Sequence, residues 1–177
     1  MFGLYQLSMW LFAAADKSYS FQNSNLQMAV DICKDARELA SAGKQKEACD
    51  EFMSGIVIGR PIVQRLQESV SKTTSEDDPT LALDWLVSSY VELCRSRGED
   101  WVSARKDAWA ACMYSMYNDM EALDCMLTVC RNTDDLIGEI QTLRQILACD
   151  GESSALTMTQ NEIKERIRVL EKALGLD

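Results

Sequence analysis

Apolar side chains recur three and four residues apart along nearly the whole chain, which is the period of α-helices that pack on one side. No convincing run shows the alternation of apolar and polar residues that is typical of a half-buried strand. Only two prolines and eight glycines interrupt the 177 residues. The pattern predicts an all-α fold, a single-domain bundle or short array of about five to seven helices.

Capping motifs predict where several of these helices begin. Ser24 and Gln27 have capping-box spacing, in which each side chain satisfies a free backbone N–H of the first turn. Asp78 is a candidate N-cap because Pro79, which lacks an N–H, suits the first helical position. Further predicted caps are Asn132 or Thr133, and Thr159 with Glu162.

Other local signals predict helix ends and contacts. Pro61 is expected to end or kink the second helix, because proline removes a helical N–H and clashes with the preceding turn. Gly55 and Gly59 lie four residues apart in an apolar run, which predicts close helix packing in the core. Residues 71–78, SKTTSEDD, are predicted to form a flexible loop.

The first 15 residues, MFGLYQLSMWLFAAA, are the most apolar stretch and precede the first charge, Asp16. The run is too short to span a bilayer and lacks the basic region of a secretory signal. We assign residues 1–22 as an apolar N-terminal arm and residues 23–177 as the helical domain. Packing on the protein's own core, docking on a partner and peripheral membrane contact all remain open. The candidate docking residues are Phe2, Leu4, Tyr5, Leu7, Trp10 and Phe12.

The chain contains no histidine, and its 18 basic against 28 acidic residues give a net charge of −10. Without imidazole, Ser-His-Asp and Cys-His catalysis and Glu-x-x-His di-iron sites are excluded. Glycine-rich phosphate-binding motifs are absent too. We therefore expect no enzymatic activity, no cofactor and no metal. The acidic charge argues against a nucleic-acid partner, because such binding depends on Lys and Arg at phosphates.

Seven cysteines, an odd number without a C-x-x-C pair, are spread along the chain. Most fall at apolar positions of the helical pattern, which predicts buried structural thiols. This usage favours an intracellular reducing compartment, cytosol or organelle stroma or matrix, rather than secretion. A thiol switch through Cys33 and Cys49 is the alternative.

Methionine, tryptophan and tyrosine are concentrated between Trp101 and Met126. This stripe is either ordinary core or a soft, adaptable binding groove. Basic residues gather near its start, where they form a candidate contact patch for an acidic partner. The patch consists of Arg95, Arg97, Arg105 and Lys106.

One segment has a family resemblance. Residues 29–61 read AVDICKDARELASAGKQKEACDEFMSGIVIGRP, with Ile32, Ala36, Leu39, Gly43, Ala48, Phe52, Gly55 and Pro61 in order. This order resembles a tetratricopeptide helix pair and covers about a fifth of the chain, and no second repeat aligns at the same period. The resemblance implies two closely packed antiparallel helices and a protein-binding surface.

These features predict a non-enzymatic helical adaptor, linker or accessory subunit of a larger protein assembly, which docks on protein partners through the N-terminal arm. A large membrane complex, contacted peripherally through residues 1–15, would suit such a subunit. One alternative is a helical carrier of an apolar ligand or pigment. The other is an RNA-binding or regulatory helical protein.

Overall fold

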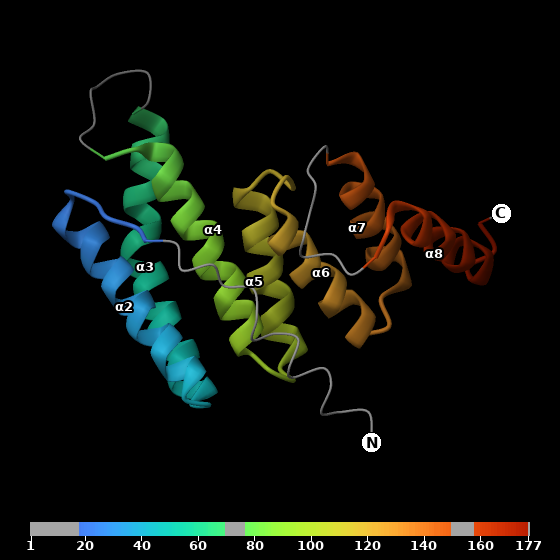
Figure 1. The fold of residues 1–177 in the computed structure, drawn as a ribbon, viewed down its shortest axis with the longest axis horizontal. Helices are drawn as coiled ribbons and strands as arrows, with labels where there is room; N and C mark the ends of the chain where they lie inside the picture. The colour runs from blue at the N-terminus through green and yellow to red at the C-terminus, as the bar shows by residue number, and fades with distance from the viewer. Residues whose placement is uncertain (1–17, 70–76, 150–157, 177) are drawn as a thin grey trace.

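The computed structural model of the protein describes residues 18–69, 77–149 and 158–176. These residues form seven α-helices and no strand, which confirms the predicted all-α class (Figure 1). The candidate docking residues of the N-terminal arm lie outside the described residues. The helices are α2 (Ser24–Ser41), α3 (Gln45–Ser69), α4 (Pro79–Ser96), α5 (Trp101–Tyr114), α6 (Met120–Asn132), α7 (Leu136–Ala148) and α8 (Gln160–Ala173).

The helices form a short array of two rows (Figure 1). Each described helix packs against the next one along the chain. In addition, α2 contacts α4 and α4 contacts α6, so these three form one row. Within the described residues, α3, α5 and α7 make no such contact with one another and form the second row. Among the described helices, the last one, α8, packs on α7 alone.

Glycines let α3 approach its neighbours closely, as their spacing predicted. A Cβ atom at Gly55 would lie 2.9 Å from the carbonyl oxygen of Ala29 on α2. A Cβ atom at Gly59 would overlap the ring of Trp85 on α4. Neither site has room for a side chain, so both glycines are required by packing rather than by backbone conformation.

Replacing Gly59 by alanine should lower the free energy of unfolding by about 1–3 kcal/mol, because overlap with Trp85 outweighs the better helix propensity of alanine. Chemical denaturation of the two proteins measures the difference. Ser54→Ala, at an exposed position of the same helix, is the control and should change stability by less than about 0.5 kcal/mol. A neutral Gly59→Ala variant would show that α3 and α4 are not packed this closely.

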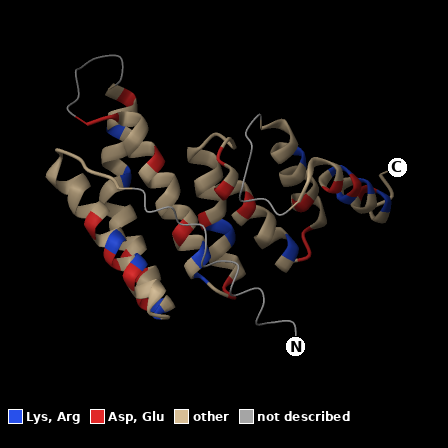
Figure 2. Cartoon of the chain, viewed as in Figure 1, with Lys and Arg blue, Asp and Glu red and all other residues tan. Residues whose placement is uncertain are grey.

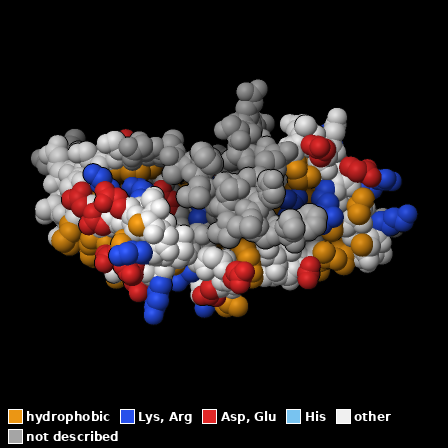
Figure 3. Space-filling model, turned by 60° about the horizontal axis from the view of Figure 1, so that its bottom comes forward, with side chains coloured by type: hydrophobic (Ala, Val, Ile, Leu, Met, Phe, Trp, Pro, Cys, Tyr) orange, Lys and Arg blue, Asp and Glu red, His pale blue; other side chains and the backbone are white. Residues whose placement is uncertain are grey.

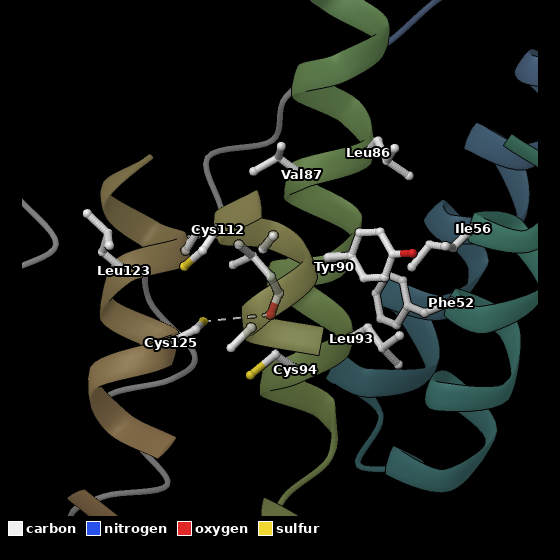
Figure 4. Packing of buried hydrophobic residues seen from close by; sticks show 14 of the residues in the cluster. Phe52, Ile56, Leu86, Val87, Tyr90, Leu93, Cys94, Cys112, Leu123 and Cys125 are labelled. Carbon is white, nitrogen blue, oxygen red and sulfur yellow. Dashed lines mark hydrogen bonds between the residues drawn. The ribbon is translucent and has the colours of Figure 1, made fainter. Parts of the chain in front are cut away.

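The core extends through both rows (Figure 4). Tyr90 projects from α4 towards Phe52 and Ile56 of α3, and cysteines of α4, α5 and α6 meet on the other side of α4. The Cys125 thiol points at the Val91 carbonyl, 3.9 Å away. Six of the seven cysteines are buried, as predicted, and none forms a disulfide. Burial raises the pKa of the Cys33 thiol to about 11, so this thiol stays protonated near neutral pH.

The first helix begins one residue earlier than the sequence motif predicts. Its N-cap is Asn23, whose side chain accepts hydrogen bonds from the backbone N–H of Leu26 at 3.1 Å and of Asn25. The predicted cap, Ser24, is the first helical residue instead. Tertiary structure explains the shift, because the Asp77 carboxylate accepts the Asn23 N–H at 2.9 Å and fixes the chain at this point.

Of the two outcomes predicted at Pro61, an end or a kink, the end is wrong, because α3 continues to Ser69. The carbonyl that loses its partner belongs to Val57, four residues earlier, and Val57 is exposed. Water can therefore satisfy that carbonyl, while Ile62 and Val63 are buried and hold the next turn on the core.

The remaining caps are partly as predicted. Asp78 accepts the Thr80 N–H at 2.8 Å, and the Thr159–Glu162 capping box is complete. The cap of α7 is Asp135, which accepts the Gly138 N–H at 2.9 Å, in place of Asn132 or Thr133. Thr133 instead follows α6 as its C-cap, because α6 extends to Asn132.

Two predicted segment boundaries fall near the edges of the described residues. Tyr19 and Phe21, assigned to the arm, are buried in the core. Of the predicted loop, residues 71–76 lie outside the described part, and Asp77 is buried. Charged residues are distributed along the helices, most densely on α8 (Figure 2). No helix in the described part of the chain is both long and apolar enough to cross a membrane.

Candidate binding groove

A groove of about 880 Å³ lies between α5 and α7. Both helices pack against α6 but not against each other, so side chains of α6 form the floor between two walls. The floor is apolar and consists of Leu123, Met126 and Cys130. The α7 wall is largely polar and small, and its residues follow one helical face: Gly138, Gln141, Thr142 and Gln145.

Polar contacts tie the walls together at both ends of the groove. At the N-terminal ends of α5 and α7, Arg105 pairs with Asp135 at 2.6 Å and donates to the Thr133 hydroxyl at 2.6 Å. At the C-terminal ends, the Gln145 side-chain amide donates to the Tyr117 carbonyl at 3.2 Å. The backbone N–H of Gly138 and then Arg105 lower the pKa of Asp135, so the pair stays charged at neutral pH. These contacts hold the walls apart at a fixed spacing.

The α5 wall carries exposed apolar side chains. One face of this helix is made of small buried residues, Ala104, Ala108, Ala111 and Cys112, which pack on the neighbouring helices. On the other side Trp109 is 52% exposed and lines the groove, and Met113, one turn further on, is 48% exposed. Hydrophobic side chains lie between charged ones at several places on the described surface (Figure 3). A half-exposed tryptophan contributes little to folding but much to an interface.

The stripe from Trp101 to Met126 was predicted to be either ordinary core or a binding groove, and its residues fall into two groups. Trp101, Met120 and Met126 are partly buried against the core. Trp109 and Met113, by contrast, face solvent. The sequence could not separate the two groups, because the residues of both recur at helical spacing. The groups differ only in whether α6 and α7 cover their side chains.

The turn between α5 and α6 has an unusual backbone. Met116 and Tyr117 both have positive φ, 51° and 58°, which side-chain-bearing residues rarely adopt. The Tyr117 N–H donates to the Cys112 carbonyl at 2.7 Å, which stabilises the turn. The turn places Tyr117 at the groove and leaves Met116 83% exposed. Strained backbone of this kind is concentrated at functional sites.

The residues of the predicted basic patch are separated by ion pairs to different helices. Arg95 pairs with Glu121 of α6 at 3.0 Å, and Arg97 pairs with Asp107 of α5 at 2.7 Å. Arg105 closes one end of the groove, as described, and Lys106 is exposed on the groove wall. Two of the four basic residues therefore belong to the groove, and a contact with an acidic partner stays a prediction.

Sequence reasoning missed the α7 wall and Asp135. A signal was present in the spacing of Gly138, Gln141, Thr142 and Gln145, which puts glycine and polar residues on one face of an otherwise apolar helix. Among the described residues, no group of three or more His, Cys, Asp or Glu side chains is arranged to hold a metal ion.

Comparison with protein-family models, with curated proteins and with solved structures finds no match to this chain. The tetratricopeptide resemblance of residues 29–61 therefore stays a prediction.

Proposed function

We propose that the protein is a non-enzymatic helical adaptor or accessory subunit that binds a segment of another polypeptide in the groove between α5 and α7. The observation that carries the proposal is the half-exposed Trp109 beside an apolar floor in an open groove. Buried aromatic anchors dominate the energetics of most protein interfaces, and methionine adapts its shape to the partner. The N-terminal arm is the second predicted docking element.

The charges of the groove support a mainly apolar partner segment. Arg105 and Asp107, which both line it, are already paired with carboxylate and guanidinium groups of this chain. A partner charge placed at Arg105 or Asp107 would have to compete with these short ion pairs, whereas a partner carboxylate could pair with Lys106, which is exposed on the groove wall. An apolar segment instead gains from burial against Trp109 and Met126.

Replacing Trp109 by serine should weaken partner binding about tenfold or more, the effect of truncating a central aromatic anchor. Affinity capture with the full-length chain from its native source, followed by cross-linking mass spectrometry, measures the loss and locates the partner. Cross-links from the partner should fall on α5 and α7.

A matched pair of methionines provides the control. Met113, one turn beyond the groove residue Trp109 on α5, and Met28 on α2 are 48% and 46% exposed, so their replacement by serine removes similar surface. Met113→Ser should weaken capture, and Met28→Ser should leave it unchanged. Equal effects, or cross-links confined to other helices, would contradict the proposal.

The same groove favours one second candidate, a carrier of an apolar small molecule. Its volume of about 880 Å³ lies within the range of ligand pockets. Native mass spectrometry of protein from its source separates the two functions. A bound small molecule of defined mass supports the carrier, and a bound polypeptide supports the adaptor.

A further inference from the structure

The solvent side of α5 carries a regular and mainly apolar line of side chains, the α5 ridge. Four of the 14 residues of this helix are exposed, and they lie four, three and four positions apart: Val102, Lys106, Trp109 and Met113. Three of the four are large apolar side chains, and Val102 is 71% exposed. A surface helix normally presents charged and polar side chains to water. An apolar line on the exposed side is typical of a surface that another protein covers.

The spacing of the α5 ridge fits a helix better than an extended segment. Residues that alternate three and four positions apart lie on one line along a helix, and a second helix packs along that line at a crossing angle of about 20°. The ridge repeats about every 5.3 Å, whereas a strand repeats on one side about every 6.7 Å and falls out of step. From Val102 to Met113 the ridge is about 17 Å long, so a partner helix contacts it over about three turns.

The groove beside the α5 ridge has the chemistry to receive the apolar side of such a helix. Its floor, formed by α6, includes the apolar side chains of Leu123 and Met126. On the far side, the α7 wall presents uncharged Gln141 and Gln145, and Gly138 has no side chain that would keep a helix at a distance. A helix that lies along α5 therefore covers apolar surface on the ridge and on the floor without facing a charge on α7.

Lys106 is the charged member of the α5 ridge. The neighbouring charged residues of the groove are paired within this chain, Arg105 with Asp135 at 2.6 Å and Asp107 with Arg97 at 2.7 Å. Within the part of the chain that the structure describes, no carboxylate forms an ion pair with Lys106. Covering an ammonium group without a counter-charge is costly, so a helix that covers the ridge has to bring a carboxylate to this point. A single lysine in an apolar helix seam selects the partner in this way.

We infer that the α5 ridge binds an amphipathic helix of a partner protein, and that the apolar side of this helix carries an Asp or Glu that pairs with Lys106. The inference rests on the proposed function, because it states the structure and the charge of the polypeptide that occupies the groove. The α5 ridge of a second copy would bring a lysine instead of a carboxylate, so it lacks the complementary charge.

Selection from a peptide library tests the inference without knowledge of the natural partner. The probe is a phage-displayed library of helix-forming peptides of about five turns, randomised along one side and selected on the full-length protein. Enriched peptides should have apolar residues three and four positions apart with an Asp or Glu among them. A labelled peptide of this kind should bind Lys106→Glu at least about tenfold more weakly in fluorescence anisotropy, because two carboxylates then face each other. Exchanging the acidic residue of the peptide for lysine should restore binding to this variant.

Lys34→Glu is the matched control, because Lys34 is an exposed lysine on α2, a helix that does not contact α5 within the described residues. It should leave peptide binding unchanged. Lys106→Glu should keep the wild-type circular dichroism spectrum, since Lys106 is exposed as well. A library without binders, enriched peptides without an acidic residue in the apolar line, or equal binding to wild type and Lys106→Glu would overturn the inference.

The dependence on Trp109 separates this inference from the proposed function. Peptides that lack the acidic residue but lose binding in Trp109→Ser would leave the proposed function standing and reject only the charged helix as occupant. Peptide binding that is unaffected by Trp109→Ser would contradict both. A wild-type dimer in sedimentation velocity that Trp109→Ser dissociates would assign the α5 ridge to a second copy and would also overturn the inference.

Discussion

Trp85→Ala is expected to lower the free energy of unfolding by about 3–5 kcal/mol. The Trp85 side chain is fully buried on α4 and its ring lies against Gly59 of α3, where only hydrogen fits. Truncation leaves a cavity that two helices packed this closely cannot collapse to fill. For a chain of this size the thermal midpoint should fall by about 6–20 °C.

Two variants control for the chemistry of tryptophan. Trp109→Ala removes the same atoms from a half-exposed site and should cost less than about 1 kcal/mol. Trp85→Phe should cost less than half as much as Trp85→Ala, because the buried indole N–H has no hydrogen-bond partner among the described residues. Similar losses for Trp85→Ala and Trp109→Ala would show that Trp85 is not at the centre of the core.

Replacing both Arg131 and Arg166 by alanine is expected to lower the free energy of unfolding by about 3–5 kcal/mol, the second large effect. Arg131 of α6 and Arg166 of α8 each bond the Glu139 carboxylate of α7, at 2.9 and 3.0 Å, and Glu139 is only 1% exposed. Without the arginines a buried carboxylate has no counter-charge. Because α7 is the one described helix that α8 packs on, hydrogen exchange should show that α8 opens more readily than the rest of the fold in this variant.

The matched variant Glu139→Gln should lower the free energy of unfolding by less, about 1–2 kcal/mol, because it leaves two arginines rather than a buried carboxylate unpaired. Their side chains are about 40% exposed, so water can replace the lost bonds. A larger loss for Glu139→Gln than for the double arginine variant would contradict this account of the network.

The pH dependence of stability provides an independent check of the network. Burial alone would raise the pKa of Glu139, but hydrogen bonds from Arg166 and Arg131 outweigh it and hold the pKa below its usual value. A lowered pKa stabilises the fold above the unfolded-state pKa of about 4.3, and this contribution is lost as pH falls through the lower folded value. In the double arginine variant burial acts alone and raises the pKa. The difference in free energy of unfolding between the wild type and the double arginine variant should therefore be largest near neutral pH and shrink towards pH 3. Chemical denaturation across this pH range measures it.

Local chemistry made several elements predictable. The capping box at Thr159, the Asp78–Pro79 start and the close packing at Gly59 depend on residues within one helix and its first contact. The errors arose where a distant residue intervened. Asn23 replaces Ser24 as the cap because Asp77 bonds its backbone. At Pro61 the predicted end, as opposed to the predicted kink, is wrong, because buried residues beyond Pro61 pack on the core and α3 continues.

The sequence by itself determined that the chain is helical, because the spacing of apolar residues and the caps act over a few residues of one segment. It also determined that a histidine-free chain lacks the imidazole chemistry of many helical proteins. Only the tertiary structure decided which of the apolar residues between Trp101 and Met126 are packed against the core and which, like Trp109 and Met113, are left half exposed. That outcome depends on α5 and α7 both packing on α6 without touching each other, and on the Arg105–Asp135 pair that joins their ends. Contacts between helices far apart in the sequence leave no local pattern. The buried and the half-exposed apolar residues therefore have the same helical spacing and cannot be told apart by it.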